Sequence, residues 1–310
     1  MISGNDKMDI ELLKADPNLF IENTIKDYVA TSPLNRIITF DNMLISEEPI
    51  VAFANGDDSL FNDFKTIIGD HHITPREAFE KYIERKGWRY GQKSTIENLS
   101  VISYAMPISY ETRLSERQTS LGGSPRYNHS RWRGEIFRSH LSNYVVSLLE
   151  LMGCNAVAPS YARLAETQST PDGFLAGWSE RHIAYACGLG TFGLNGLMIT
   201  SKGCAVYLNS VVCDLVLIPT PRVYDSHVAN CLFYRDGSCR QCLERCAEGA
   251  ISEQGRSNIK CRENLGKNQA VKLKELGLDK EFIGLAPSCG LCSTNVPCED
   301  RIPASVTDKN

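Results

Sequence analysis

The chain gathers most of its cysteines in one region, at spacings that suit iron–sulfur chemistry. Eight of its twelve cysteines fall between Cys231 and Cys298. A bacterial ferredoxin run has the spacing C-x2-C-x2-C-x3-C-P, and its thiolates hold [4Fe–4S] clusters. Here the run CRQCLERC, 239–246, keeps C-x2-C-x3-C, with Asp236 at the position of the first cysteine and Ala247 at that of the proline. A second run, CGLCSTNVPC, 289–298, follows, so the pattern predicts an electron-transfer module.

These cysteines divide into two sets of four. In two-cluster ferredoxins the last cysteine of a run ligates the other cluster. Cys246 is therefore assigned to the second cluster and Cys298 to the first, while Cys231 and Cys261 complete the two sets. The predicted ligands of cluster one are Cys231, Cys239, Cys242 and Cys298, and those of cluster two are Cys246, Cys261, Cys289 and Cys292. Two alternatives stay open for cluster one: Asp236 as its fourth ligand, or a three-iron species.

A zinc site is the other interpretation of the same residues. The C-x2-C pairs at 239/242 and 289/292 suit a four-cysteine zinc ribbon. The segment between the two pairs is longer than in a usual ribbon, and four of the eight cysteines would have no role. Iron–sulfur is therefore the preferred prediction.

Composition limits the classes of function. The net charge is -4 and the pI about 5.9, so the whole chain lacks a basic footprint for nucleic acid. No apolar run reaches the ~20 residues of a membrane span, and the polar, acidic N-terminus does not suit a signal peptide. We expect a cytoplasmic protein without a membrane partner, in which cysteines serve metals rather than disulfides. The four remaining cysteines are predicted to be buried small hydrophobes: Cys154, Cys187, Cys204 and Cys213.

Two parts are expected, residues 1–222 as an α/β domain and residues 223–310 as the cysteine-rich domain, joined by the Pro-rich segment 218–222. Residues 99–106 (LSVISYAM) predict a buried strand that ends at a proline. Thr74-Pro75-Arg76-Glu77 predicts a capping box for a helix that stops at Gly87. Apolar residues at helical spacing predict a helix over 133–152, and 197–200 and 205–217 predict strands. A strip of arginines is interpreted as a solvated helix face: Arg126, Arg131, Arg133 and Arg138.

A second candidate for chemistry is the glycine-rich segment 180–200, ERHIAYACGLGTFGLNGLMIT. Glycines allow the backbone to approach a planar cofactor or a phosphate. The letters G-L-G-T-F-G match a dinucleotide-binding motif, but that motif must follow a strand and open a helix. Here it follows a predicted helix and precedes a strand, so a Rossmann site is rejected. A glycine-rich turn from helix to strand stays open as the alternative. Residues 122–125 (GGSP) predict a loop, either over a ligand or at the surface.

The same segment carries a resemblance to a known family. Together with the cysteine order, it resembles the cobalamin-dependent iron–sulfur reductases, namely the epoxyqueuosine reductases and the reductive dehalogenases. The resemblance covers roughly residues 95–300. The matching positions are Val101 to Pro107, Glu180-Arg181, Ala184, Gly188-Leu189-Gly190, Gly193, Asn195, Leu197 to Thr200, Cys213-Asp214-Leu215 and Cys261.

The resemblance implies a nitroreductase-like α/β (α+β) domain that binds cobalamin in base-off form, followed by a ferredoxin-like domain with two [4Fe–4S] clusters that pass electrons to cobalt. Family members use an aspartate or a tyrosine as proton donor, and Asp172 and Tyr161 are the candidates here. Leu194 departs from the family's Lys or Arg. The implied corrinoid-binding residues are Gly188, Leu189, Gly190, Gly193, Asn195 and Gly196.

The preferred hypothesis is a cytoplasmic corrinoid- and iron–sulfur-dependent oxidoreductase that acts on a small molecule or a modified nucleoside. Its electrons would come from an external donor such as ferredoxin or flavodoxin. A tRNA substrate is less favoured, because the pI is acidic and no helical-repeat extension follows Cys298. The alternatives are an iron–sulfur protein that reduces the corrinoid of another protein, and a zinc-stabilised binding module.

Overall fold

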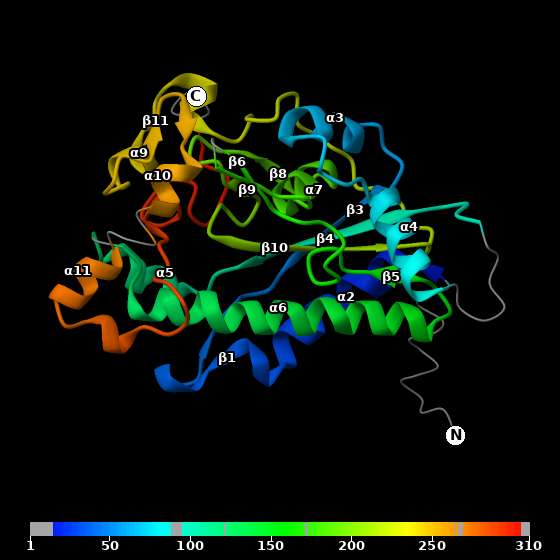
Figure 1. Cartoon of the computed structure of the whole chain (residues 1–310), viewed down its shortest axis with the longest axis horizontal. Helices are drawn as coiled ribbons and strands as arrows, with labels where there is room; N and C mark the ends of the chain where they lie inside the picture. Colours follow the sequence, from blue (N-terminus) through cyan, green and yellow to red (C-terminus); the bar gives the residue numbers. More distant parts are fainter. Residues whose placement is uncertain are drawn as a thin grey trace.

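The computed structural model describes residues 15–87, 95–120, 122–170, 173–263, 265 and 269–304. Figure 1 shows a central sheet with helices on both faces and the cysteine-rich segments gathered at one end. The helices are α2 (Pro17–Thr31), α3 (Leu60–Ile68), α4 (Pro75–Lys86), α5 (Tyr110–Arg117), α6 (Pro125–Leu151), α7 (Glu180–Ala186), α8 (Leu232–Asp236), α9 (Gln241–Glu244), α10 (Asn258–Glu263) and α11 (Gln269–Glu275), with short 3-10 helices η1 (Pro33–Asn35), η2 (Ile38–Phe40), η4 (Asp279–Glu281) and η5 (Leu291–Ser293). The strands are β1 (Arg36–Ile37), β2 (Met43–Leu44), β3 (Ile50–Asn55), β4 (Ser100–Pro107), β5 (Ala156–Val157), β6 (Gln168–Thr170), β7 (Gly173–Leu175), β8 (Gly190–Phe192), β9 (Met198–Thr200), β10 (Val206–Cys213), β11 (Ile251–Ser252) and β12 (Gly255–Arg256).

The central sheet has the strand order β3-β4-β10-β5, and each neighbouring pair is antiparallel. All eight residues of β4 are buried, which confirms the buried strand predicted for this stretch. Alternate β4 side chains enter two different cores: Ile102 and Tyr104 pack on one face, and Val101 and Ala105 on the other. The sequence of a strand that is covered on both faces is a continuous apolar run, because neither set of side chains contacts water.

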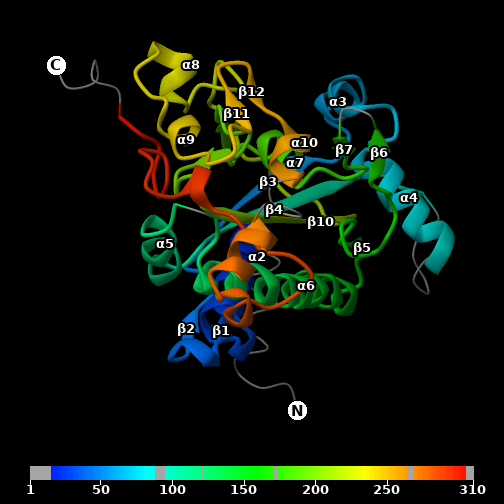
Figure 2. The same cartoon turned by 60° about the vertical axis from the view of Figure 1, so that its left-hand side comes forward.

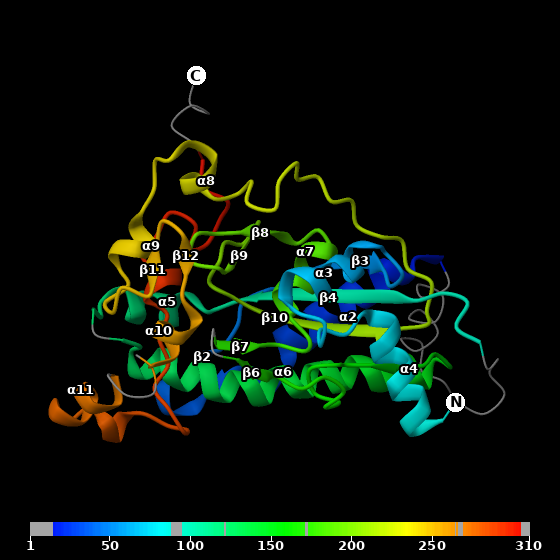
Figure 3. The same ribbon diagram turned by 45° about the horizontal axis from the view of Figure 1, so that its top comes forward.

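Helices cover both faces of this sheet (Figures 1 and 3). The long helix α6 lies with α2 along one face, and its Phe137, Leu141 and Val145 are fully buried there. The second core, on the other face, contains residues of α3, α4 and α7, among them Phe79 and Ile183. The predicted α/β (α+β) class is therefore confirmed. Within the described ranges, no helix is both long and apolar enough to cross a bilayer.

Two helix predictions have different outcomes. The capping box at Thr74 and Glu77 is present, and α4 ends before Gly87, which has a positive φ of 79°, as predicted. The predicted start of the long helix at residue 133 is wrong, because α6 begins at Pro125, with the Ser124 hydroxyl accepting a hydrogen bond from the Tyr127 amide. The added first turns are polar yet buried, since the cysteine-rich segments cover them; the Asn128 amide oxygen accepts a hydrogen bond from the Ile283 amide.

The arginine strip and the two predicted strands are also partly corrected. Arg138 is buried, with its guanidinium 4.2 Å from the ring centroid of Tyr207, so the strip is not a continuous solvated face. Both strands exist, as β9 and β10. However, β9 pairs with β8 in a separate hairpin, and β10 ends at Cys213; the carboxylate of the next residue, Asp214, accepts a hydrogen bond from the Asn155 side-chain amide.

The cysteine-rich segments pack against the end of the sheet where β4 ends and α6 begins (Figure 2). Helix α5 provides much of this contact. Arg117 forms an ion pair with Glu299 at 2.7 Å, and Glu116 accepts hydrogen bonds from the amides of Ser124 and Gly290. Gly123 is buried in the same contact: a Cβ there would lie 1.7 Å from the Ser288 carbonyl oxygen. The predicted GGSP loop is therefore buried in this contact and is not a surface turn.

Candidate metal centre

The first cavity in the cysteine-rich region, called cavity one below, is lined by all four cysteines predicted for cluster one. These are Cys231, Cys239, Cys242 and Cys298. Apolar side chains fill most of the remaining wall, including Leu194, Ile199 and Val296. The cavity is narrow, with about 20 Å³ of open volume.

The structure separates the two candidates for the fourth ligand of this cavity. Cys231 stands at the N-terminal cap of α8 and faces cavity one. Asp236 ends the same helix, is exposed, and accepts a hydrogen bond from the Ser238 amide at 2.9 Å. The geometry therefore favours Cys231 over Asp236.

The second cavity, cavity two, brings together all four cysteines predicted for cluster two. Its open volume is about 140 Å³. The side chains come from the loop after α9, from α10 and from the segment around η5, which are far apart in sequence. The four are Cys246, Cys261, Cys289 and Cys292. Tyr127 of α6 and Arg256 of β12 complete part of the wall.

One buried amide lies beside a cysteine of cavity two. Gln269 is 1% exposed, so its side-chain amide is buried. This amide lies beside the Cys289 thiol, and amides that donate to cluster sulfurs are a usual part of such sites.

Across the described residues, no three His, Cys, Asp or Glu side chains converge closely enough to hold a single metal ion.

Burial keeps several of these thiols protonated in the absence of metal. It raises the pKa of Cys242 to about 12 and that of Cys289 to about 11. Metal ligands must be thiolates, so metal binding at these cavities releases protons.

A ninth cysteine adjoins cavity one. Cys204 is 3% exposed, as predicted for a buried small hydrophobe, but its Sγ lies 3.6 Å from Sγ of Cys298. The hydrogen bond that it donates lowers the pKa of Cys298. The two residues are separated by 94 positions, so no local spacing could have revealed the contact. Of the other three cysteines predicted to be buried, Cys187 and Cys213 are buried and Cys154 is partly buried.

The glycine-rich segment forms a turn from helix to strand, and atoms of the protein itself occupy the space around its first glycines. A Cβ on Gly190 would lie 2.2 Å from the Ile199 carbonyl oxygen across the β8–β9 hairpin. A Cβ on Gly188 would lie 3.0 Å from the Pro221 carbonyl oxygen. Leu189 is 6% exposed and packs in the core between the sheet and α7. These positions need glycine for contacts within the protein.

The rest of this segment contacts the cysteine cavities. Gly193, Leu194 and Asn195 line cavity one. The Asn195 amide donates to the Cys292 carbonyl oxygen at 2.7 Å, which ties the turn to the second cysteine run. Gly196 has a φ of 68° and lies against Arg181 and Arg256. Of the residues predicted to bind a corrinoid, Gly188, Leu189 and Gly190 are thus packed by protein atoms.

The two predicted proton donors are not brought to the cysteines. Asp172 lies outside the described residues. Tyr161 packs against the core on the α6 side of the sheet, where its hydroxyl accepts a hydrogen bond from Asn209 at 3.0 Å. Burial raises the pKa of Tyr161, so the phenol is protonated at neutral pH. Among the described contacts, none joins Tyr161 to either cysteine cavity.

Sequence patterns also missed two buried titratable groups. Glu116 is fully buried, and burial raises its pKa to about 7 despite two backbone amide donors. His72 is fully buried beside Trp178 and Phe64, and burial lowers its pKa to about 4. Neither position carries a local signal, because both are buried by contacts far along the chain.

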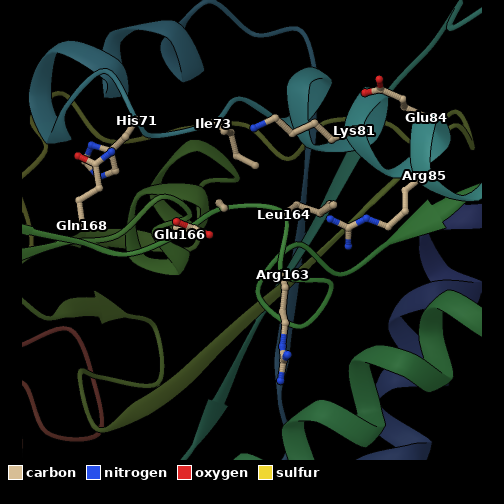
Figure 4. A pocket seen from close by; sticks show the side chains of 10 residues that line it. His71, Ile73, Lys81, Glu84, Arg85, Arg163, Leu164, Glu166 and Gln168 are labelled. Carbon is tan, nitrogen blue, oxygen red and sulfur yellow. The ribbon is translucent and has the colours of Figure 1, made fainter.

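A larger cavity of about 710 Å³ lies between α4 and the segment 163–168 (Figure 4). Lys81 and Arg85 extend into it from α4, and Arg163, Glu84 and Glu166 also belong to its lining. Its volume is within the range of small-molecule sites. Gln168 of β6 belongs to its lining, β6 pairs with β7, and α10, which carries Cys261, packs against β7.

Comparisons with known proteins give structural similarity only. The epoxyqueuosine reductase of Bacillus subtilis is 15% identical, with 82% of this chain and 65% of that chain covered and a TM-score of 0.39. For the enzyme of Streptococcus thermophilus the identity is 15%, the coverage 84% and 65%, and the TM-score 0.44. An epoxyqueuosine reductase solved with an epoxyqueuosine-modified tRNA-Tyr stem loop is 15% identical, with 78% and 56% covered and a TM-score of 0.36.

The chain thus spans about 65% of the length of the first two of these structures. No family model matches the chain, and no curated protein matches it. The resemblance to epoxyqueuosine reductases predicted from the sequence is confirmed as a similarity of structure.

Proposed function

We propose that the chain is an iron–sulfur reductase that holds two [4Fe–4S] clusters and passes their electrons to an acceptor bound by the α/β part. The observation that carries this proposal is the division of eight cysteines into two cavities of four, which matches the two ligand sets predicted from spacing. Cluster one would be held by Cys231, Cys239, Cys242 and Cys298, and cluster two by Cys246, Cys261, Cys289 and Cys292.

The 710 Å³ cavity is the proposed acceptor site. Its three basic side chains, Lys81, Arg85 and Arg163, against two carboxylates favour a small molecule or modified nucleoside that carries negative charge. Gln168 of β6 lines this cavity, and β7, the partner of β6, packs against the helix that carries Cys261, which supports cluster two as the donor to the acceptor. Because the structures that resemble this chain are epoxyqueuosine reductases, epoxyqueuosine is the first acceptor to test.

A corrinoid would supply a low-potential cobalt centre between the clusters and the acceptor. Three of the residues predicted to hold it, Gly188, Leu189 and Gly190, are packed by the protein's own atoms, so the proposal routes no step through cobalt. This packing favours a second candidate: an iron–sulfur protein that reduces the corrinoid of another protein. A zinc-stabilised binding module is the third candidate, and it predicts zinc in the same cysteine cavities.

The test is an anaerobic assay of the protein reconstituted with iron and sulfide, supplied with reduced ferredoxin or flavodoxin and with epoxyqueuosine as free nucleoside or in tRNA. Queuosine formation without added cobalamin supports the proposal. Cluster reduction by the donor without queuosine, but with reduction of a separate corrinoid protein, favours the second candidate. Failure of the donor to reduce any cluster contradicts both.

A further inference from the structure

Two arginines on different elements lie close together, and one of them lines cavity two. Arg256, at the end of β12, lines the cavity beside its cysteines, and its Nε is buried without a hydrogen-bond partner in the described part of the chain. Arg181, in the first turn of α7, donates from Nη1 to the Gly196 carbonyl oxygen. The two side chains meet at Gly196, where a Cβ would lie 3.7 Å from Nη1 of Arg181 and 3.8 Å from Cβ of Arg256.

These two positive charges have no carboxylate partner among the residues that the structure describes. Other arginines that are at least as buried are paired, as Arg113 is with Glu299 and Arg138 with Glu135. Burial and the charge of Arg256 lower the pKa of Arg181, which indicates that the pair repel each other. Partly buried charges without partners are costly, so an anion is expected beside them. A cluster held by four thiolates is an anion, and it becomes more negative when it is reduced.

Cavity one offers a different electrostatic environment. None of the residues that line it is charged, and most of its wall is apolar, with Leu194, Leu232 and Phe233 among the side chains. An apolar wall disfavours the added negative charge of a reduced cluster, whereas nearby guanidinium groups favour it.

We propose that Arg181 and Arg256 raise the reduction potential of cluster two above that of cluster one, and so set the direction of electron flow. This inference rests on the proposed function. An external one-electron donor of the ferredoxin or flavodoxin class reduces cluster one. Cluster one then returns to its oxidised state as its electron moves to cluster two, whose ligand Cys261 lies on α10, the helix that packs against β7.

The experiment is an anaerobic redox titration of the reconstituted protein, followed by EPR, in the wild type and in Arg256→Gln. A Cys261→Ser variant identifies the signal of cluster two, because only that cluster changes a ligand. We expect the cluster-two signal to have the higher potential. In Arg256→Gln its equilibrium constant for one-electron reduction should fall about tenfold or more, which corresponds to about 59 mV, while cluster one stays unchanged.

Two further variants keep the test decisive. Arg256→Lys retains the charge and should retain the potential, which separates the effect of charge from that of misfolding. Arg76→Gln removes a surface arginine that is paired with Asp57, and should leave both potentials unchanged. Clusters that assemble with unaltered potentials in Arg256→Gln, or a cluster two of lower potential than cluster one, overturn the inference alone. Absence of iron from the wild type instead overturns the proposed function.

Discussion

The buried carboxyl of Glu116 is expected to make stability depend on pH near neutrality. Its two oxygens accept hydrogen bonds from the amides of Ser124, at 2.6 Å, and Gly290, at 2.8 Å, so it joins the start of α6 to the second cysteine run. Burial raises its pKa from 4.5 to about 7. That difference corresponds to about 3 kcal/mol of unfolding free energy.

The sign follows from the direction of this pKa change. Because the folded chain binds the proton more tightly than the unfolded chain, the contribution is fully present below pH 4.5 and is lost as pH rises through about 7. Between pH 5.5 and pH 8 the wild type should lose about 2 kcal/mol through this group alone. Glu116→Gln cannot ionise, but its amide nitrogen faces a backbone N–H, which costs about 1–3 kcal/mol at every pH.

The assay is urea unfolding under anaerobic conditions, with fluorescence detection, at pH 5.5 and at pH 8. At pH 5.5 the wild type should be the more stable protein. At pH 8 the advantage should shrink by about 2 kcal/mol, so that the two proteins become similar or change order. Glu111→Gln, on the exposed face of the same helix, is the matched control. An equal stability difference between wild type and Glu116→Gln at both pH values would refute the reasoning.

Three other changes test the metal centre and the core. Cys231→Ala should lower the iron content from about eight per chain to about four, or to about seven if a three-iron cluster survives. Asp236→Ala should leave the iron content unchanged. The reverse result would make Asp236 the ligand. Cys204→Ala should keep all the iron but lower the potential of cluster one, because a hydrogen bond to Cys298 is lost, and the equally buried Cys213→Ala should not shift it. Phe137→Ala, in the fully buried face of α6, should cost about 3–5 kcal/mol of unfolding free energy; a loss under 1 kcal/mol would place it outside the core.

Local patterns in the sequence were sufficient for some elements and not for others. The capping box of α4 and the apolar run of β4 are local signals, and both elements appear where they were predicted. The first turns of α6 were missed because their residues are polar. Their burial depends on contacts such as that between His129 and the Glu281 carbonyl oxygen, 152 positions apart, which no helical periodicity reveals.

Some residues of the candidate site could likewise be predicted from local patterns, and others could not. The grouping of cysteines followed from short spacings, and the two cavities contain the same two sets of four. Cys204 and Glu116 were missed, because each acts across the chain, on Cys298 and on Gly290. For the glycines the sequence signal was present but allowed two interpretations, because a residue without a side chain can give room to a cofactor or to the protein's own backbone. At Gly190 the hairpin partner Ile199 occupies the space.

The measurement that most directly tests the central claim is the metal and sulfide content of the protein, purified anaerobically and reconstituted with iron and sulfide. The account predicts about eight irons and eight sulfides per chain, with EPR signals of two clusters after reduction. Zinc bound at the cysteines, with neither iron nor sulfide, would contradict it.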